Sequence, residues 1–307
     1  MARAPQAAGQ RAGPCPSRRS VATMSPATLL WRQLRRHPLL ALAAPVLLSL
    51  WYAVEVWLLR PDLTYQGLPR TTATTPWTWH RVLRNDGFLV GWSDLRGNPL
   101  WVTYRVTDIP DNAPRLPRPG SFRRDWRSLN PLDHDSYTRS GYQRVHLAPN
   151  YAISRLYGRE AQLQTFLMTN ISPQRAGLNQ KLWQRLEELE VDHFAPRVGE
   201  LWVITGPIFE APRERLSSSL LVEIPDAFYR IWISPGAIPS ALAFRVPQGV
   251  RGTEPLTRFV TSIDAIEAAT GLDFFHALPD DIEAPLEAAR SPDTWGLPEV
   301  ARRAPRY

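Results

Sequence analysis

The stretch that decides the fold of this chain is Ser140–Asn150, which reads SGYQRVHLAPN. It contains His146, an imidazole that can accept a proton from water, and Arg144, a guanidinium that can face a phosphate group. Further along, Leu178–Trp183 (LNQKLW) contains Asn179, whose amide oxygen can bind a hard cation. A proton acceptor, a cation ligand and a guanidinium are the minimum equipment for hydrolysing a phosphodiester.

The spacing of residues after Gly177 predicts a helix over about 177–190. Asn179, Trp183 and Glu187 follow one another at i, i+4 and i+8, so they form one slowly rotating stripe. In an α-helix the first and last of them lie about 80° and about 12 Å apart, too far to bind one ion directly. Glu187 would then act through a water. In the alternative interpretation Asn179 only caps the helix, Trp183 packs in the core and Glu187 is solvated.

Further segments carry a family resemblance. They are Tyr65-Gln66-Gly67-Leu68-Pro69, Asn98-Pro99-Leu100-Trp101, Val203-Ile204-Thr205-Gly206-Pro207-Ile208, Ile224-Pro225-Asp226-Ala227-Phe228-Tyr229, Ser262-Ile263-Asp264-Ala265-Ile266-Glu267 and Thr270-Gly271-Leu272-Asp273-Phe274-Phe275. In this order, with the two stretches above, they resemble the DNA/RNA non-specific endonuclease family, which includes the endonuclease G type and secreted bacterial nucleases with a ββα-metal (His-Me) finger. The resemblance covers residues 65–280.

The resemblance implies a role for four residues. The histidine of the family's Asp-Arg-Gly-His motif, the general base, falls on His146, and the motif arginine falls on Arg144. The metal-binding asparagine falls on Asn179 and the supporting glutamate on Glu187. As a base, His146 must be neutral, so activity should fall as the pH drops through its pKa, expected near the reference of about 6.5 if the ring is unperturbed.

The resemblance also implies a cofactor and a phosphate contact. The cofactor is Mg²⁺, with Mn²⁺ as a substitute, and one protein ligand suffices because Mg²⁺ keeps most of its waters. Arg123 corresponds to a second family arginine that steadies the charged phosphorane, although Arg124 could take that part. The predicted substrates are DNA and RNA, cut to 5′-phosphate and 3′-hydroxyl ends.

Three positions depart from the family pattern. Gln143 stands at the motif aspartate, Val145 at the motif glycine and Val191 at an arginine four residues after the glutamate. The site has therefore lost a carboxylate and a guanidinium. The sequence leaves two functions open: an active endonuclease, or a catalytically weakened relative that binds nucleic acid or a protein partner.

Apolar and β-branched runs predict an α+β fold, a single mixed domain with a central, largely antiparallel sheet flanked by helices. Strands are expected at 87–92, 100–106, 201–204, 228–233 and 241–246, with helices at 177–190, 262–269 and 279–290. The predicted organisation is a disordered basic segment over 1–38, a transmembrane anchor over 39–59, a linker over 60–80, the endonuclease domain over 81–290 and a tail over 291–307.

The N-terminal segment holds the charge imbalance of the chain. Residues 1–60 carry eight arginines and one acid, whereas residues 61–307 carry 28 basic and 28 acidic side chains. The net charge of +7 is therefore no nucleic-acid footprint on the folded part. Residues 39–59, LLALAAPVLLSLWYAVEVWLL, have the length of a membrane-spanning helix, with a cleaved signal peptide and a buried core helix as alternatives.

Arginines before the apolar run and few after it predict a cytoplasmic N-terminus. We expect a bacterial inner-membrane protein with its catalytic domain in the periplasm, and a mitochondrial location as the alternative, because the Arg-rich leader resembles a presequence. Met24 could be the true start, and the single cysteine, Cys15, allows no internal disulfide. Other predicted partners are the lipid bilayer, a second copy of the chain and an inhibitor protein.

Overall fold

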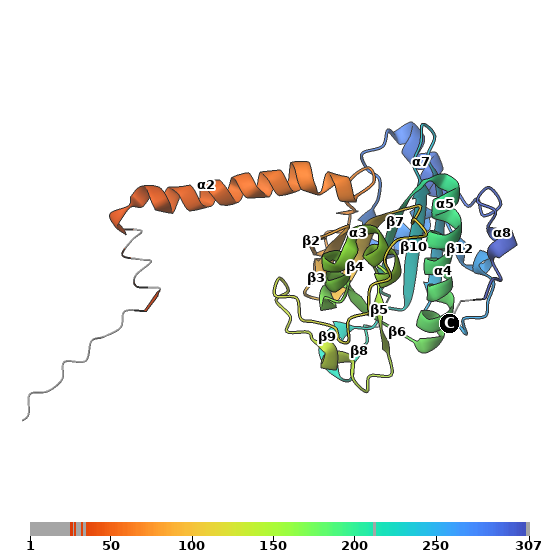
Figure 1. Ribbon diagram of the computed structural model, residues 1–307, viewed down its shortest axis with the longest axis horizontal. Helices are drawn as coiled ribbons and strands as arrows, with labels where there is room; N and C mark the ends of the chain where they lie inside the picture. The colour runs from red at the N-terminus through yellow and green to blue at the C-terminus, as the bar shows by residue number, and fades with distance from the viewer. Residues whose placement is uncertain (1–24, 27, 29–31, 33–34, 211–212, 305–307) are drawn as a thin grey trace, which may run out of the picture. The chain divides into compact units, whose positions relative to one another are not determined.

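The computed structural model of the chain describes residues 25–26, 28, 32, 35–210 and 213–304 (Figure 1). The predicted disorder over 1–38 falls mostly outside the described residues, as do Cys15 and the alternative start at Met24. The chain divides into two compact units, Met1–Val54 and Glu55–Tyr307.

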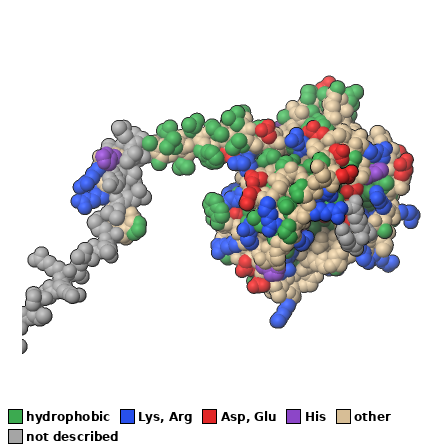
Figure 2. All heavy atoms as spheres, in the orientation of Figure 1, with side chains coloured by type: hydrophobic (Ala, Val, Ile, Leu, Met, Phe, Trp, Pro, Cys, Tyr) green, Lys and Arg blue, Asp and Glu red, His purple; other side chains and the backbone are tan. Residues whose placement is uncertain are grey.

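The first unit contains the helix α2 (Pro38–Val54), whose side chains from residue 43 onward are largely exposed and mostly apolar (Figure 2). Within the described part of the chain, no helix is both long and apolar enough to cross a membrane. The predicted transmembrane helix over 39–59 is therefore not found. Its last residues form a π-helix, η1 (Glu55–Leu59), in the second unit, where the buried Glu55 carboxylate pairs with Arg84 at 2.9 Å.

The second unit is built on a seven-stranded sheet in which every pairing is antiparallel. Its strands, in spatial order, are β12 (Val260–Thr261), β11 (Ser240–Pro247), β10 (Ala227–Ser234), β7 (Glu200–Ile208), β4 (Asn98–Thr107), β3 (Phe88–Ser93) and β2 (Arg81–Asn85). The prediction of an α+β fold with a central antiparallel sheet is confirmed, and the strands expected at 87–92 and 100–106 pair as β3 and β4.

Both faces of this sheet are buried. Because side chains alternate along a strand, Val102 and Tyr104 of β4 enter one hydrophobic core, whereas Trp101 enters the other. Phe228 and Tyr229 of β10 divide between the cores in the same way. A sheet covered on both faces explains why β4, β7 and β10 read as nearly continuous apolar runs.

One face is covered by the helix α3 (Asn150–Thr165) and by a continuous helical segment over 178–198 (Figure 1). That segment, hereafter the site helix, consists of η6 (Leu178–Trp183, π), α4 (Gln184–Leu189), η7 (Glu190–Phe194, π) and α5 (Ala195–Val198). It packs on the sheet through Trp183 against Phe228, with ring centroids 5.6 Å apart, and through Phe194 against Trp232. The predicted helix over 177–190 is thus correct in place but extends eight residues further, and α3 was not predicted.

The opposite face is covered by α6 (Ile263–Thr270) and α7 (Asp280–Ala288). Ser262 caps α6 by accepting a hydrogen bond from the Ala265 amide at 3.2 Å, and Gly271 ends the helix in the left-handed conformation. Ile266 and Leu286 from these helices are buried in the second core. The helices predicted at 262–269 and 279–290 are confirmed.

Two segments outside the predicted domain of 81–290 belong to the folded unit. In the predicted linker over 60–80, Tyr65 packs in the second core and β1 (Arg70–Thr71) pairs with β13 (Leu272–Asp273). In the predicted tail over 291–307, α8 (Leu297–Val300) is present and Trp295 is buried against Phe194. Their Pro-rich, weakly patterned sequences suggested loops, but each contributes large side chains to a core.

The remaining regular elements are short. They are η2 (Pro61–Leu63), η3 (Pro76–Thr78), η4 (His134–Tyr137), η5 (Met168–Asn170), η8 (Leu256–Phe259), and the two-stranded sheets β5 (Gln143–His146) with β6 (Ile171–Gln174) and β8 (Arg215–Leu216) with β9 (Ser219–Glu223).

Candidate active site

The ribbon of β5 and β6 carries the decisive stretch of sequence and is followed directly by the site helix. Gln143 pairs with Gln174 and His146 with Ile171 in an antiparallel register. Asn170, fully buried before β6, accepts a hydrogen bond from the Ala148 amide at 2.9 Å and donates to the carbonyls of Ala148 and Thr165. The two strands and the helix thus form a ββα unit, locked by the amide that the sequence places at Asn170.

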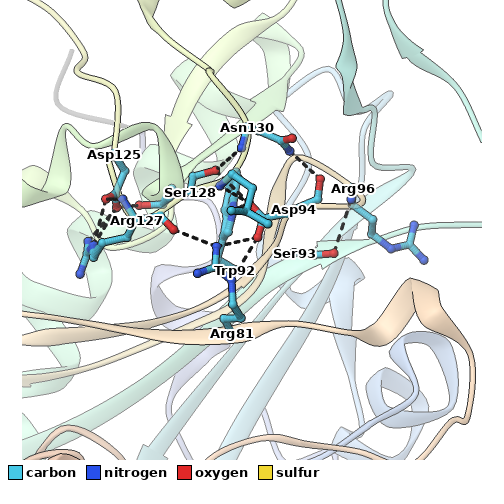
Figure 3. Close-up of polar contacts among 11 residues, drawn as sticks. Arg81, Trp92, Ser93, Asp94, Arg96, Asp125, Arg127, Ser128 and Asn130 are labelled. Carbon is cyan, nitrogen blue, oxygen red and sulfur yellow. Dashed lines mark hydrogen bonds and ion pairs between the residues drawn. The ribbon is translucent and has the colours of Figure 1, made fainter. Parts of the chain in front are cut away.

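A second network braces the loop that precedes β5 (Figure 3). Asp94, after β3, accepts hydrogen bonds from the Leu129 amide at 2.8 Å and from Arg81 at 2.6 Å. The buried Asp125 accepts from Arg127 at 2.7 Å and from the Thr169 hydroxyl at 2.6 Å. Because Thr169 adjoins Asn170, this network joins the loop over 122–130 to the end of the ββα ribbon.

One cavity of about 360 Å³ opens beside β5 and the site helix. It is lined by Arg118, Arg144, Val145, His146, Asn150, Tyr151, Asn179, Gln180, Gln184, Glu187 and Glu188. The tertiary structure therefore brings four of the predicted site residues to one cavity: His146, Arg144, Asn179 and Glu187.

His146 is held in an aromatic setting and is 8% exposed. Its ring lies edge-on to Phe166, with centroids 4.7 Å apart, and beside Phe122 at 5.2 Å. Burial lowers the pKa of His146 to about 3, and the positive charge of Arg118 acts in the same direction. The imidazole is therefore neutral over the ordinary pH range, and the reference pKa of about 6.5 for an unperturbed ring does not apply because burial disfavours the charged form.

Nε2 of His146 is buried and makes no hydrogen bond to the residues that the structure describes. A buried ring nitrogen without a partner is costly in a structural histidine, which normally finds one. The imidazole is thus held by packing alone.

Asn179 lies in the π-helical first turn of the site helix, η6. Its Nδ2 donates a 2.8 Å hydrogen bond to Oε1 of Gln143, the residue at the first position of the motif. The side-chain hydrogen bond of Asn179 thus runs to β5 and not to a backbone amide at the start of its own helix. Single π turns are frequent at functional sites because they re-aim side chains that a regular α-helix would place elsewhere.

Arg144 is fixed by backbone and aromatic contacts. Its guanidinium donates to the His134 carbonyl from Nε at 3.0 Å and also from Nη2, and to the Thr138 hydroxyl at 3.3 Å. It lies over the rings of Phe122 and Tyr137 at 5.9 Å and 5.7 Å. These contacts use two of its three nitrogens and hold the group at the edge of the cavity.

Glu187 lines the cavity above a buried charge network. Burial raises its pKa to about 8; Arg230, 3.9 Å away, opposes the shift and Glu190 reinforces it. Arg230 and Glu190 are fully buried and 3.6 Å apart. Glu190 also accepts hydrogen bonds from the hydroxyl of Tyr104 at 2.8 Å and from the indole of Trp232 at 3.1 Å.

The arginines that line the cavity are not all the ones that the sequence suggested. Arg123 and Arg124 are exposed and do not line the cavity; Nη2 of Arg123 donates to the Leu163 carbonyl at 3.2 Å. Arg118 does line it, with its guanidinium 5.1 Å from the ring centre of Phe166. Sequence reasoning missed Arg118 because it lies in the Pro-rich stretch 110–120, with only its charge as a signal.

The sequence segments that form this site match a known protein family. The family model of the DNA/RNA non-specific endonucleases matches residues 70–281. The chain belongs to this endonuclease family. The match includes both strands of the ββα unit and the site helix, so the His146 and Asn179 segments lie inside the family region.

Among curated proteins, the endonuclease-family chain is similar to a nuclease of Serratia marcescens, with 29% identity over 206 residues, which cover 61% of this chain and 72% of the relative. It is also similar to a mitochondrial nuclease of Saccharomyces cerevisiae, with 25% identity over 223 residues, covering 65% and 67%. Among solved structures, it shares its fold with a chain of the complex between EndoG and EndoGI, with a TM-score of 0.56 and 20% identity, covering 71% of this chain and 90% of that chain.

Proposed function

We propose that this chain hydrolyses phosphodiester bonds of DNA and RNA without sequence specificity, as a metal-dependent endonuclease. The observation that carries the proposal is the cavity shared by His146, Asn179, Arg144 and Glu187. These residues come from β5 and the site helix, and together they offer a proton acceptor, an amide oxygen, a guanidinium and a carboxyl group. Membership of the endonuclease family supports the same chemistry.

His146 is the proposed general base. It lines the cavity in its neutral form, the form that accepts a proton from an attacking water. The same burial makes the imidazole a weak base in the free protein. A phosphate group bound in the cavity would favour the protonated ring by its negative charge and so raise the basicity of His146 when substrate is present.

Asn179 is the proposed ligand of Mg²⁺, or of Mn²⁺ as a substitute. Because its Nδ2 donates to Gln143, its Oδ1 is left as an acceptor for a cation. Glu187 lines the same cavity and would orient water molecules around the ion. When bound, the ion supplies positive charge for the phosphoryl oxygens and the leaving oxygen.

The arginines are proposed to hold the phosphate. Arg144 and Arg118 line the cavity, so they are placed to contact the phosphate group that is cut. Arg123 and Arg124 are exposed outside it, so we propose them as contacts for neighbouring phosphates of a long substrate.

The test is cleavage of plasmid DNA and of a structured RNA by the full chain, with Mg²⁺ or with EDTA. We expect cutting that needs the metal and that falls by at least a hundredfold in both His146→Ala and Asn179→Ala. Glu160→Gln, an exposed acid on α3, is the matched control and should cut normally. Folded protein that binds nucleic acid in a salt-dependent manner without cutting it would overturn the proposal and favour the weakened, binding-only relative.

Similarity to the mitochondrial nuclease of Saccharomyces cerevisiae supports the mitochondrial alternative. A second copy of the chain and an inhibitor protein stay predictions.

A further inference from the structure

Three carboxylates meet between α6 and α7, in the layer on the opposite face of the sheet from the catalytic cavity. They belong to Asp264 and Glu267 of α6, which share a helix face at i and i+3, and to Glu287 of α7. One oxygen from each lies within 4.8 Å of the others.

Glu287 distinguishes this cluster from an ordinary group of acidic side chains on the surface, because it is buried. It is 8% exposed, and its Oε1 is buried without a hydrogen-bond partner among the described residues. Its carboxylate is directed at those of Asp264 and Glu267, and no basic side chain in the described part of the chain forms an ion pair with any of the three. A buried carboxylate aimed at two others without a counter-charge is strongly disfavoured unless a proton or a cation joins them.

The dipoles of α6 and α7 also favour a cation at this cluster. Glu267 and Glu287 lie in the last turns of α6 and α7, where the negative end of the helix dipole disfavours an anion and favours a cation. Burial, together with the neighbouring carboxylates, raises the pKa of Glu267 to about 7 and that of Glu287 to about 8. Either a shared proton or a bound cation would therefore relieve the repulsion among the three carboxylates.

We propose that Asp264, Glu267 and Glu287 bind a calcium ion that ties α6 to α7. Ca²⁺ takes oxygen ligands at about 2.3 to 2.6 Å, so two oxygens bound to one ion lie at most roughly 5.2 Å apart, and the three oxygens of this cluster fall within that limit. Mg²⁺ usually keeps several waters and binds through one or two carboxylates, so a set of three carboxylates suits Ca²⁺ better. The site is structural, because its ligands lie on helices that cover the face opposite His146 and Asn179.

The experiment is thermal unfolding of the full chain, freed of metal with EDTA and then titrated with CaCl₂. We expect a rise in Tm of several degrees that continues with the logarithm of the calcium concentration once the site is filled, because an ion that binds only the folded state stabilises it in that way. The rise should persist in Asn179→Ala, which separates this site from the catalytic one. It should vanish in Glu287→Gln.

The apo proteins give a second readout. Without calcium, Glu287→Gln should unfold at a higher temperature than the wild-type chain at pH 8, because the amide removes a buried negative charge while keeping the shape. The control Glu160→Gln should respond to calcium as the wild-type chain does.

An equal calcium response in Glu287→Gln overturns the proposal. So does a wild-type Tm that rises as the pH falls from 8 to 6 but does not respond to calcium, because a shared proton then holds the cluster. Nuclease activity of Glu287→Gln in Mg²⁺ should be unchanged, so failure of this inference leaves the proposed function intact.

Discussion

Asn179 donates a hydrogen bond of 2.8 Å from Nδ2 to Oε1 of Gln143, across the boundary between the site helix and β5. The departure from the family motif at Gln143 therefore does not leave a gap. A neutral amide now accepts from the asparagine and fixes which of its two ends faces the cavity. Gln143 acts on the site by positioning Asn179, and it belongs to the same ribbon as His146.

Replacing Gln143 with leucine should weaken the metal site rather than the fold. Losing this acceptor lets the Asn179 amide rotate, at a cost of about 1 to 2 kcal/mol or roughly 5- to 30-fold. We expect the Mg²⁺ concentration that gives half-maximal cleavage to rise by that factor. Gln143→Asp keeps an acceptor and should preserve the Mg²⁺ requirement of the wild-type chain. An unchanged Mg²⁺ dependence in Gln143→Leu would show that Gln143 does not position Asn179.

Acidic pH should not inactivate the enzyme through His146. A base must be neutral, a histidine is neutral above its pKa, and burial holds the pKa of His146 at about 3. The value of kcat/KM at saturating Mg²⁺ reports the ionisation of the free protein, so it should show no loss with a midpoint near 6.5, measured between pH 5.5 and 8 with the fold monitored by circular dichroism. A midpoint near 6.5 in kcat/KM that moves to higher pH in Arg118→Gln would contradict the buried setting of the ring, because Arg118 lowers the pKa of His146.

Arg118 and Arg124 make a matched pair for testing the cavity. Arg118 lines it and Arg124 does not, although both are exposed arginines of neighbouring loop segments. Losing a charge-assisted contact to the phosphate should cost about 1.5 to 3 kcal/mol, so Arg118→Gln should lower kcat/KM on a short oligonucleotide by roughly 10- to 150-fold. On the same substrate Arg124→Gln should change it by less than about threefold. Equal losses would place the phosphate outside the cavity.

Breaking the buried charge network below Glu187 should destabilise the protein. Arg230 is fully buried between Glu187 and Glu190, so Arg230→Met leaves two carboxyl groups without their cation. Removing one partner of a buried pair typically costs about 3 to 5 kcal/mol, measured here as a lower free energy of unfolding in urea. Adding Glu190→Gln should recover part of that loss. A single variant as stable as the wild-type chain would mean that Arg230 is not electrostatically coupled to the site.

The sequence predicted most of the sheet and the central part of the site. β4, β7 and β10 are runs of β-branched and aromatic residues bounded by Gly, Pro and polar turns, and such local patterns have few structural alternatives. His146 and Asn179 were found because their motifs are short and contiguous. α3 was missed because its polar residues and the kink at Gly158 interrupt the apolar periodicity.

By itself, then, the sequence determined the α+β class, the family and the two segments that carry His146 and Asn179. Only the tertiary structure decided that Arg118 replaces Arg123 and Arg124 beside the cavity, that Glu55 pairs with Arg84, and that Glu287 meets α6. The physical reason is the range of the interactions. Strand and motif signals act between neighbours along the chain. Charge pairing and pKa shifts depend on groups that lie far apart in sequence and meet only when the segments that carry them pack in the folded protein.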